Sequence, residues 1–487
     1  MRTTRRRVMA LLAGATLIGG TALVGTPMVA HAAGVPSAPR GVQAIGYVNA
    51  VRVGWSSPSD DGGSPVSGYR LRNAIDGTVW TVATPALDPT FLTGLPSGVA
   101  LTLRVAAVNA AGTGPESSPV TVTPHSEFPG PVWKKGQDAL TGRFWAQSAV
   151  LPRGRVLVIG GDVQTKSGSA PTPSAEIYDS ATTTWSAVDP MPSLRTSFGL
   201  TVLRNGKVLL TGGNSDSGAP DRRAWILDPA TGHWSRTGSM KVARAGHAAV
   251  LLADGTVLAA GGRYNLASRV TQTSETYDPA TGTWTLAGSM LHPRTRGLAV
   301  RLAERNGRVL YAGGTAGHHG QRYAELYRPS TRTWAATGSM VVARNHDDAG
   351  EASVTLLNDG RVLVAGGYRY GPTPQTTGPQ RTAEIYTPST GTWAATSTMP
   401  FATTAGHRAV LLPSGLVVVA GGQDTFGSLA VVQGFNPTTG KWARLNDLNG
   451  DREYPIAAPL SGGRILVATG LRITPETILQ DSEIYWP

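Results

Sequence analysis

The sequence predicts an all-β chain in two parts, a small β-sandwich followed by a closed ring of seven four-stranded sheets. Two observations predict this architecture. Residues 35–125 contain several short segments in which apolar and polar side chains alternate with a period of two, as in half-buried strands. Residues 131–487 repeat one pattern of strands, glycines and aromatic residues seven times.

Residues 1–32 have the layout of an export signal. They combine a basic start, an apolar run from Val8 and a small-residue cleavage site at Ala30-His31-Ala32. The stretch Thr4-Arg5-Arg6-Arg7 resembles a twin-arginine signal, and an ordinary secretory signal with extra arginines is the alternative. No later stretch has about 18 consecutive apolar residues, so we expect a secreted, extracellular protein without a transmembrane anchor.

The composition excludes several kinds of chemistry. The chain has no cysteine, which excludes disulfides, thiolate nucleophiles, Fe–S clusters and zinc–thiolate sites. Its net charge is +12, and cleavage after residue 32 would remove four arginines and no acidic residue. This charge favours anionic surfaces or polymers. No basic run is interleaved with aromatic residues, so nucleic acid is not an expected partner.

Residues 33–125 carry the strand and turn signals of a sandwich. Alternating segments at 51–55, 69–72 and 101–105 are separated by the turn residues 60–65, and a second turn at 109–115 follows. The segment resembles a fibronectin type III domain through its early proline, Trp55, the Tyr69 strand, Leu95-Pro96-Ser97-Gly98 and Asn109. The resemblance implies a spacer or adhesion module without chemistry of its own. Leu101 stands where the family has its corner tyrosine, so that hydroxyl hydrogen bond is absent.

Each repeat of the second part reads as four strands. An apolar run ends in a small-residue pair, and the pairs recur every 48 to 55 residues. These pairs are Gly160-Gly161, Gly212-Gly213, Gly261-Gly262, Gly313-Gly314, Gly366-Gly367, Gly421-Gly422 and the variant Thr469-Gly470. In six repeats an aromatic residue or leucine then precedes a tryptophan by seven positions, as in Tyr277 and Trp284. A lone four-stranded sheet cannot bury both faces, whereas sheets stacked radially can.

The repeats resemble Kelch repeats, which implies that residues 126–487 form a seven-bladed β-propeller. The last repeat ends at Glu483-Ile484-Tyr485 without a fourth strand, and Val132-Trp133 has the pattern of one. We therefore expect the segment around Trp133 to complete the last sheet and to close the ring. The turns between first and second and between third and fourth strands should share one face. The longer connections should share the other face, which is where function is expected.

An arginine recurs where the first strand of six repeats begins, at Arg143, Arg195, Arg244, Arg294, Arg344 and Arg452. A ring of guanidinium groups could bind anionic ligands. The alternative is structural, because glutamates recur on the third strands of the same repeats. Those glutamates are Glu176, Glu275, Glu325, Glu384 and Glu483. The second repeat has Trp225 in place of the glutamate, so Arg195 is the arginine expected to be free for a ligand.

The fifth repeat differs from the others by an insertion and a long loop. The insertion brings Asn345, His346, Asp347, Asp348 and Glu351 to the expected functional face, and the loop adds Tyr368, Arg369 and Tyr370. The third repeat contributes Arg263 and Tyr264. Aromatic faces stack on sugars while polar groups bind hydroxyls, so this is the expected carbohydrate site. His346 and the three acidic residues are also the candidates for glycosidic hydrolysis, and a solvated loop is the alternative.

No metal or other cofactor is expected. His247 and His407 occupy matching positions in two repeats, which favours a packing role over a metal site. The propeller is also similar to that of galactose-oxidase-like enzymes. That resemblance implies a copper site with a tyrosine cross-linked to cysteine, and this chain has no cysteine.

These observations favour an exported, monomeric binding protein whose partner is an extracellular glycan or a cell-surface polymer. The first alternative is a carbohydrate-active enzyme, a glycoside hydrolase or lyase, that uses the acidic residues of the fifth repeat. The second alternative is a scaffold that binds another protein. Fold alone does not decide between these functions.

Overall fold

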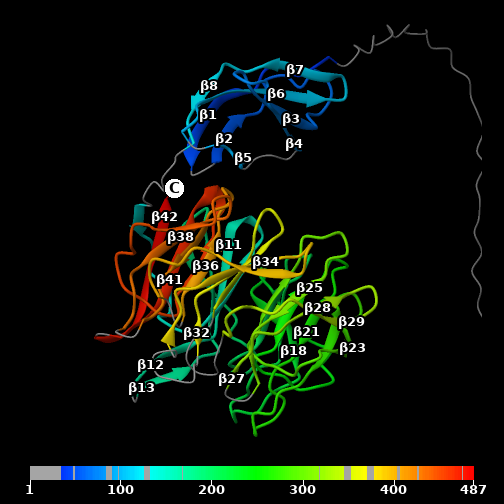
Figure 1. Cartoon of the computed structure of the whole chain (residues 1–487), viewed down its shortest axis with the longest axis vertical. Coiled ribbons are helices and arrows are strands. Elements are labelled where there is room, and N and C mark those ends of the chain that lie inside the picture. The colour runs from blue at the N-terminus through cyan, green and yellow to red at the C-terminus, as the bar shows by residue number, and fades with distance from the viewer. Residues whose placement is uncertain are drawn as a thin grey trace, which may run out of the picture.

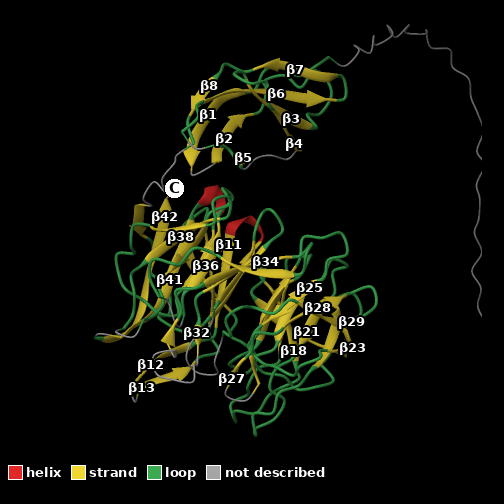
Figure 2. Ribbon diagram, viewed as in Figure 1, coloured by secondary structure: helices red, strands yellow, loops and turns green. Residues whose placement is uncertain are grey.

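The fold of this chain is built almost entirely from strands and loops (Figure 2). The computed structural model describes residues 34–47, 50–83, 90–96, 98–124, 132–166, 168–316, 319–344, 352–369, 378–402, 406–424, 427–473 and 475–486. The helical segments within these residues are short 3-10 turns, at Pro152–Gly154 and Ser461–Gly463. The prediction of an all-β chain is confirmed.

The first part is a sandwich of two sheets. One sheet has the order β1-β2-β5, and the other has the order β4-β3-β6-β7 with β8 paired to β6. Val51, Leu71 and Leu103 are fully buried between the sheets, as the alternation predicts. Leu101 is buried in the same core, so an aliphatic side chain fills the position of the corner tyrosine. The strands are β1 (Arg40–Tyr47), β2 (Ala50–Ser56), β3 (Gly68–Asn73), β4 (Val79–Ala83), β5 (Thr90–Thr93), β6 (Leu101–Asn109), β7 (Gly112–Glu116) and β8 (Val120–Val122).

The described part of residues 132–486 contains seven antiparallel four-stranded sheets, numbered here in chain order (Figure 1). Sheet 1 has β10 (Gln147–Leu151), β11 (Arg155–Ile159), β14 (Ala175–Asp179) and β15 (Thr184–Val188). Sheet 2 has β16 (Gly199–Val202), β17 (Val208–Thr211), β18 (Ala224–Asp228) and β19 (His233–Thr237). Sheet 3 has β20 (Ala248–Leu251), β21 (Val257–Ala260), β22 (Thr273–Asp278) and β23 (Thr283–Ser289). Sheet 4 has β24 (Leu298–Arg301), β25 (Val309–Ala312), β28 (Ala324–Arg328) and β29 (Thr333–Thr337).

The remaining three sheets follow the same order of strands. Sheet 5 has β30 (Ser353–Leu356), β31 (Val362–Ala365), β34 (Ala383–Thr387) and β35 (Thr392–Ala395). Sheet 6 has β36 (Arg408–Leu411), β37 (Val417–Ala420), β38 (Val432–Asn436) and β39 (Lys441–Arg444). Sheet 7 has β40 (Ile456–Pro459), β41 (Ile465–Ile473), β42 (Glu476–Trp486) and β9 (Val132–Lys135). Short hairpins in the loops are β12 (Asp162–Thr165) with β13 (Gly168–Pro171), β26 (Thr315–Ala316) with β27 (His319–Gly320), and β32 (Tyr368–Arg369) with β33 (Gly378–Pro379).

The first strands of the sheets contact one another in a closed cycle, β10 to β16, β20, β24, β30, β36, β40 and back to β10. These strands therefore line the inside of a ring. Some of the small-residue pairs also link neighbouring sheets. The second glycine donates its N–H to the backbone carbonyl of the next recurring arginine from Gly213 to Arg244 at 2.8 Å, from Gly262 to Arg294 at 2.8 Å and from Gly422 to Arg452 at 2.9 Å. Gly470 donates in the same way to Arg143, and this bond joins sheet 7 to sheet 1.

The last sheet is completed by the segment that precedes the first sheet, as the sequence predicts. β9 pairs with β42, and Trp133 lies opposite Tyr485 in the register. The two rings lie 5.6 Å apart between centroids, close to the 5.1 Å of Tyr277 and Trp284 inside sheet 3. The indole N–H of Trp133 also donates to the carbonyl of Asn446. Strand β9 thus takes the place of the fourth strand of sheet 7 and holds residues 132–135 against the end of the chain.

Candidate functional site

The recurring arginines and acidic residues form buried ion pairs between strands. Each pair has side chains that are almost completely shielded from solvent. The N–O distances are 2.7 Å for Arg143–Glu176, 3.0 Å for Arg244–Glu275, 2.5 Å for Arg294–Glu325, 2.8 Å for Arg344–Glu384 and 2.9 Å for Arg452–Glu483. The structural interpretation of the arginine–glutamate pattern is therefore correct for these five pairs.

The pair in sheet 3 shows what these residues do. Arg244 donates to the carbonyl oxygens of Gly261 at 2.9 Å and Thr273 at 2.7 Å, which ties the second and third strands together. Glu275 accepts the backbone N–H of Lys241 at 2.6 Å and thereby anchors the loop from the preceding sheet. Burial lowers the pKa of the Arg244 guanidinium, and the neighbouring Glu275 carboxylate opposes that shift. A charge in such a place needs its partner, so the pair is part of the scaffold.

The prediction that Arg195 is the free arginine is wrong. Its side chain is fully buried and its guanidinium lies 2.9 Å from a carboxylate oxygen of Asp221. Its Nη1 donates to the carbonyl of Gly212, and its Nε donates to the hydroxyl of Ser193. Asp221, in the loop between β17 and β18, replaces the missing glutamate because a buried guanidinium requires a counter-charge. Arg344 is likewise held inside by Glu384, so neither arginine presents its charge to a ligand.

The backbone two residues after each recurring arginine is left-handed in every repeat that the structure describes there. The φ values are 57° at Trp145, 52° at Ser197, 64° at Gly246, 53° at Arg296 and 49° at Tyr454, and the sixth repeat has Gly406 at 68°. We call these six residues the inner rim. Each lies two positions before the start of the first strand of its sheet. Two backbone bonds join neighbours on the rim: Gly246 donates to Ser197 at 2.8 Å and Arg296 donates to Gly246 at 2.7 Å.

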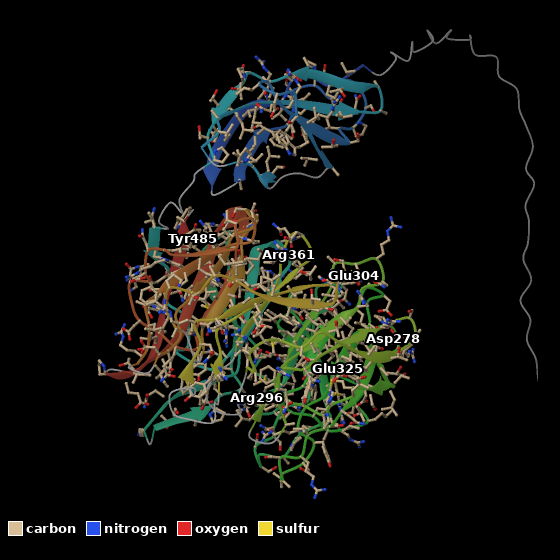
Figure 3. All side chains as sticks on the ribbon, viewed as in Figure 1. Asp278, Arg296, Glu304, Glu325, Arg361 and Tyr485 are labelled. Atoms are coloured by element: carbon tan, nitrogen blue, oxygen red, sulfur yellow. The ribbon has the colours of Figure 1, made fainter. Side chains whose placement is uncertain are left out.

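The inner rim lies at the end of the ring that carries the longer connections. Figure 3 shows Arg296 at one end of the sheets, whereas Glu304 and Arg361, from turns between first and second strands, lie toward the other end. The hairpin strand β27 in Figure 1 is on the same side as Arg296. The rim therefore belongs to the face where the sequence places function.

Side chains of the inner rim lean over the rim residue of the preceding sheet. A Cβ atom on Gly406 would lie 2.6 Å from the ring of Tyr454, and one on Gly246 would lie 3.2 Å from Cγ of Arg296. The ring of Trp145 packs edge-on against that of Tyr454, with centroids 5.3 Å apart. The two glycines thus make room for the tyrosine and the arginine that follow them around the rim.

One side of the rim is aromatic. Phe144, Trp145 and Tyr454, from the starts of sheets 1 and 7, are the aromatic arm. Phe144 lies 4.7 Å from Trp145 and 6.5 Å from Tyr454 between centroids. Phe144 is buried beneath, whereas 52% of Trp145 is exposed. An exposed tryptophan with a left-handed backbone is a rare arrangement, and such strain concentrates at functional sites.

Polar side chains lie at and beside the rim on sheets 2, 3 and 4. Arg296 of the rim, with Asn214 and Arg263 beside it, is the polar arc. Arg263 exchanges two backbone hydrogen bonds with Ala245, the neighbour of Gly246 on the rim. Its guanidinium lies 3.2 Å from the amide oxygen of Asn214. The exposed Tyr264 follows Arg263, so the two third-repeat residues predicted to bind ligand do lie beside the rim.

Two carboxyl groups adjoin the aromatic arm. Glu453 precedes Tyr454, is 5% exposed, and its Oε2 has no hydrogen-bond partner in the described structure. Burial raises its pKa to about 7. Asp162 exchanges two backbone hydrogen bonds with Phe144, and burial raises the pKa of its carboxyl as well. A carboxyl that keeps its proton near neutral pH is suited to donate it.

The predicted site in the fifth repeat is only partly described. Tyr368 and Arg369 form β32, which pairs with β33, and Arg369 is exposed. The other predicted residues of this repeat lie outside the described residues: Asn345, His346, Asp347, Asp348, Glu351 and Tyr370. Sequence reasoning missed Trp145, Arg296, Tyr454 and Glu453. The sequence feature that could have identified them is their position, one or two residues after the recurring arginine. The residue type at these positions varies between repeats, whereas the arginine recurs.

The two matching histidines have packing roles, as predicted. His247 lies 2.9 Å from the hydroxyl of Thr211, and His407 lies 3.2 Å from the hydroxyl of Ser353. Burial lowers the pKa of His247 to about 3 and that of His407 to about 4, so both are neutral at physiological pH. Each joins its own sheet to the one before.

Residues 37–123 match the fibronectin type III domain family. This finding confirms the predicted resemblance of the first part of the chain to a fibronectin type III domain. The match covers the sandwich and none of the seven sheets.

The fold of most of this chain is similar to that of a solved structure described as a novel fungal alcohol oxidase with catalytic diversity among the AA5 family, in complex with copper. The TM-score is 0.57 with 19% sequence identity, over 73% of this chain and 76% of that one. The neighbour is a galactose-oxidase-like protein with a β-propeller. At this identity the similarity concerns the fold alone.

The residues present do not fit the copper chemistry of that neighbour. The chain has no cysteine for a cross-link, and the described residues contain no group of three or more His, Cys, Asp or Glu side chains that could hold a metal ion. In the part of the chain that is described, no helix is long and apolar enough to cross a membrane.

Proposed function

We propose that this chain is an exported protein that binds carbohydrate through the inner rim of a seven-bladed, Kelch-type propeller, with the fibronectin type III domain as a spacer. The single observation that carries the proposal is the exposed Trp145, held by a left-handed backbone and packed on Tyr454. Aromatic faces stack on the C–H groups of sugars, and nearby polar groups bind the hydroxyls. The signal-like residues 1–32 support export to the extracellular space.

The rim is a better candidate than the recurring arginines or the fifth repeat alone. The buried arginines make their hydrogen bonds to groups inside the ring, whereas the rim presents different side chains on one repeated backbone geometry. Variation on a rigid frame is typical of recognition surfaces. Tyr368 and Arg369, in the connection between the second and third strands of sheet 5, would extend this surface.

The test is a glycan-array screen of the mature protein, followed by titration of each hit with wild type and Trp145→Ala. Losing one stacked aromatic should weaken binding about ten-fold. Trp486→Ala is the matched control, because Trp486 is 42% exposed and lies at the end of β42. The melting temperatures of both variants should stay near that of wild type. Hits that bind Trp145→Ala as tightly as wild type would contradict the proposal.

The second candidate function is a glycoside hydrolase, and the Glu453 carboxyl favours it. A buried carboxyl with a pKa of about 7 holds a proton at neutral pH, as a general acid must. Asp162 would supply the second carboxyl. Release of reducing sugar from a bound glycan, abolished by Glu453→Gln, would support this function. Binding without any product would support the binding role.

A further inference from the structure

A cavity of about 300 Å³ lies in the last sheet, beside the strand that closes the ring. Its lining combines residues of β9 and β42 with the end of β41 and the connection from sheet 6 to sheet 7. Trp133, Lys135, Arg472, Asp481 and Glu483 contribute to it, and its described lining includes no residue of the inner rim. The volume is at the lower end of the range of small-molecule sites, and acidic and basic groups line the same space.

Asp481 departs from the repeated pattern. It lies two residues before the recurring glutamate, where sheets 3 and 5 have a threonine. The hydroxyls of these residues, Thr273 and Thr382, accept a hydrogen bond from the recurring arginine at 2.9 Å and 3.0 Å. In sheet 7 the Oδ2 of Asp481 accepts the corresponding bond from Arg452 at 3.0 Å. The single charge of Arg452 is therefore shared by two carboxylates, those of Asp481 and Glu483.

One carboxylate oxygen at the cavity remains without a partner. The oxygens of Glu483 accept from Arg452, from the backbone N–H of Gly450 and from the backbone and side-chain N–H groups of Asn449. By contrast, the Oδ1 of Asp481 is buried and has no hydrogen-bond partner in the described structure. Such an acceptor loses hydration without compensation, so a ligand that donates a charged hydrogen bond is favoured here. An ammonium group is a donor of this kind.

Unused donors line the same cavity at Arg472. Its Nε donates to Asp451 at 2.9 Å, and its two Nη groups make no hydrogen bond within the described residues. A Cβ atom on Gly450 would lie 2.9 Å from Nη2 of Arg472 and 3.5 Å from Nη2 of Arg452. Both guanidinium groups therefore approach the same stretch of backbone, and Arg472 lies at the wall of the cavity that also carries the Arg452 pair.

Lys135 of β9 supplies a second cation, and its Nζ lies 3.7 Å from a carboxylate oxygen of Asp138. The side chains of Arg472 and Asp481 are 30% and 36% exposed, so a ligand can reach them from solvent. Among the described residues neither cation forms an ion pair with Asp481, although all three side chains line one cavity. The cavity thus presents an acceptor for a cation and donors for an anion that do not satisfy each other.

We propose that this cavity is a second binding site of the protein and that it takes a zwitterion, a free amino acid. The ammonium group donates to the Oδ1 of Asp481, and the carboxylate accepts from Arg472 and Lys135. A guanidinium suits a carboxylate because both groups are planar and form parallel hydrogen bonds. Trp133 supplies an apolar part of the lining. The inference goes beyond the glycan function proposed for the rim and does not depend on it.

The experiment measures binding to the full chain by isothermal titration calorimetry. The probes are the common L-amino acids together with β-alanine and γ-aminobutyrate, in which the two charges stand farther apart. The tightest probe is then compared with its N-acetyl form, which has no ammonium group, and with its methyl ester, which has no carboxylate. Each blocked form should bind about ten-fold more weakly, since it loses one charged contact.

The variants separate the two ends of the ligand. Asp481→Thr gives sheet 7 the residue that sheets 3 and 5 have, so the bond to Arg452 and the melting temperature should be kept. It should lose about ten-fold in affinity for the amino acid and nothing for the N-acetyl form. Arg472→Gln should lose affinity for the amino acid and keep that for the methyl ester. Arg472→Lys, which keeps the charge, should recover part of the loss.

The matched controls come from an exposed ion pair that is not part of the described lining, Arg444 with Asp447. Arg444→Gln and Asp447→Thr repeat the two chemical changes close to the same connection. Both should bind the amino acid as wild type does.

Three results would overturn the proposal: no probe binding at millimolar concentration, equal binding of free and blocked forms, or unchanged affinity in Asp481→Thr and Arg472→Gln. Trp145→Ala should leave amino-acid binding unchanged, because Trp145 is not in the described lining of this cavity. A failure at this cavity therefore leaves the glycan function of the rim untouched, and a failure at the rim leaves this site untouched.

Discussion

The buried arginine and the rim residue are two positions apart in the chain, and they follow opposite rules. The arginine of sheet 3, Arg244, has the same environment as its counterparts in sheets 1, 4, 5 and 7. The rim position keeps its backbone conformation while its side chain changes from Trp145 to Ser197 and Arg296. The position whose residue type stays the same holds the sheets together. The position whose side chain changes while its backbone conformation stays the same forms a surface that is available for recognition.

The largest expected effect comes from breaking a constant position. Arg244→Met leaves Glu275 buried without its cation and removes two bonds to backbone carbonyls. Removing one partner of a buried pair costs about 3–5 kcal/mol. Thermal and urea unfolding of the ring should show this loss.

The matched control for Arg244→Met is Arg301→Met, at an exposed position of β24. It should change the free energy of unfolding by less than about 0.5 kcal/mol. The double variant Arg244→Met with Glu275→Leu should be more stable than Arg244→Met alone, since it leaves no lone buried charge. Equal stability of the two single arginine variants would show that the buried pairs are dispensable.

An intermediate effect on stability is expected at Glu453, which lies in the chain between the buried Arg452 and the rim residue Tyr454. Its pKa is about 7 in the folded chain, against an ordinary value of 4.5. Between these values the unfolded state has lost the proton that the folded state keeps, so stability falls as pH rises. Above pH 7 the full penalty remains, on the order of 3 kcal/mol.

Glu453→Gln should remove that penalty. The variant should melt higher than wild type at pH 8 and close to wild type at pH 4. His247 titrates in the opposite sense, because its pKa of about 3 destabilises the fold as pH falls below 6.5. Both proteins retain His247, so the difference between their melting curves isolates Glu453. Parallel curves across this range would contradict the assignment.

The sequence predicts the constant positions better than the variable ones. The pairing of Arg244 with Glu275 follows from their co-occurrence in the repeats, and the closing role of Trp133 follows from the missing last strand. Asp221 could not be predicted as the partner of Arg195, because it lies outside the repeated pattern, four residues before the glutamate position. The partner of a charged loop residue is decided by the three-dimensional fold, which the repeat pattern alone does not give.

The rim was missed for a different physical reason. A search for repeats detects shared residue types, and the rim shares a backbone conformation instead. Gly246 and Gly406 alone hinted at it, because glycine often occupies left-handed positions. Nothing in the sequence reveals that Trp145 and Tyr454 adopt the same conformation and meet across the closure of the ring.

The smallest effect on stability is expected where a rim side chain is enlarged. Ser197 already has a φ of 52°, which Trp145 and Tyr454 show to be compatible with a large aromatic residue. Because rim side chains lean over the preceding sheet, Ser197→Tyr should place its ring over Trp145 and lengthen the aromatic arm. The free energy of unfolding should change by less than about 1 kcal/mol.

Ser197→Tyr should at the same time tighten binding of any glycan hit by roughly three-fold, since each stacked aromatic contributes about 0.5–1.5 kcal/mol. Ser235→Tyr, an exposed serine on the outer strand β19, is the control and should leave affinity unchanged. Two residues before Ser197, Arg195→Tyr should instead destabilise the fold by several kcal/mol, because it leaves Asp221 without its buried partner. If Ser197→Tyr destabilised the chain as much as Arg195→Tyr, the rim would be part of the structural scaffold as well. The differences between rim side chains would then not serve recognition.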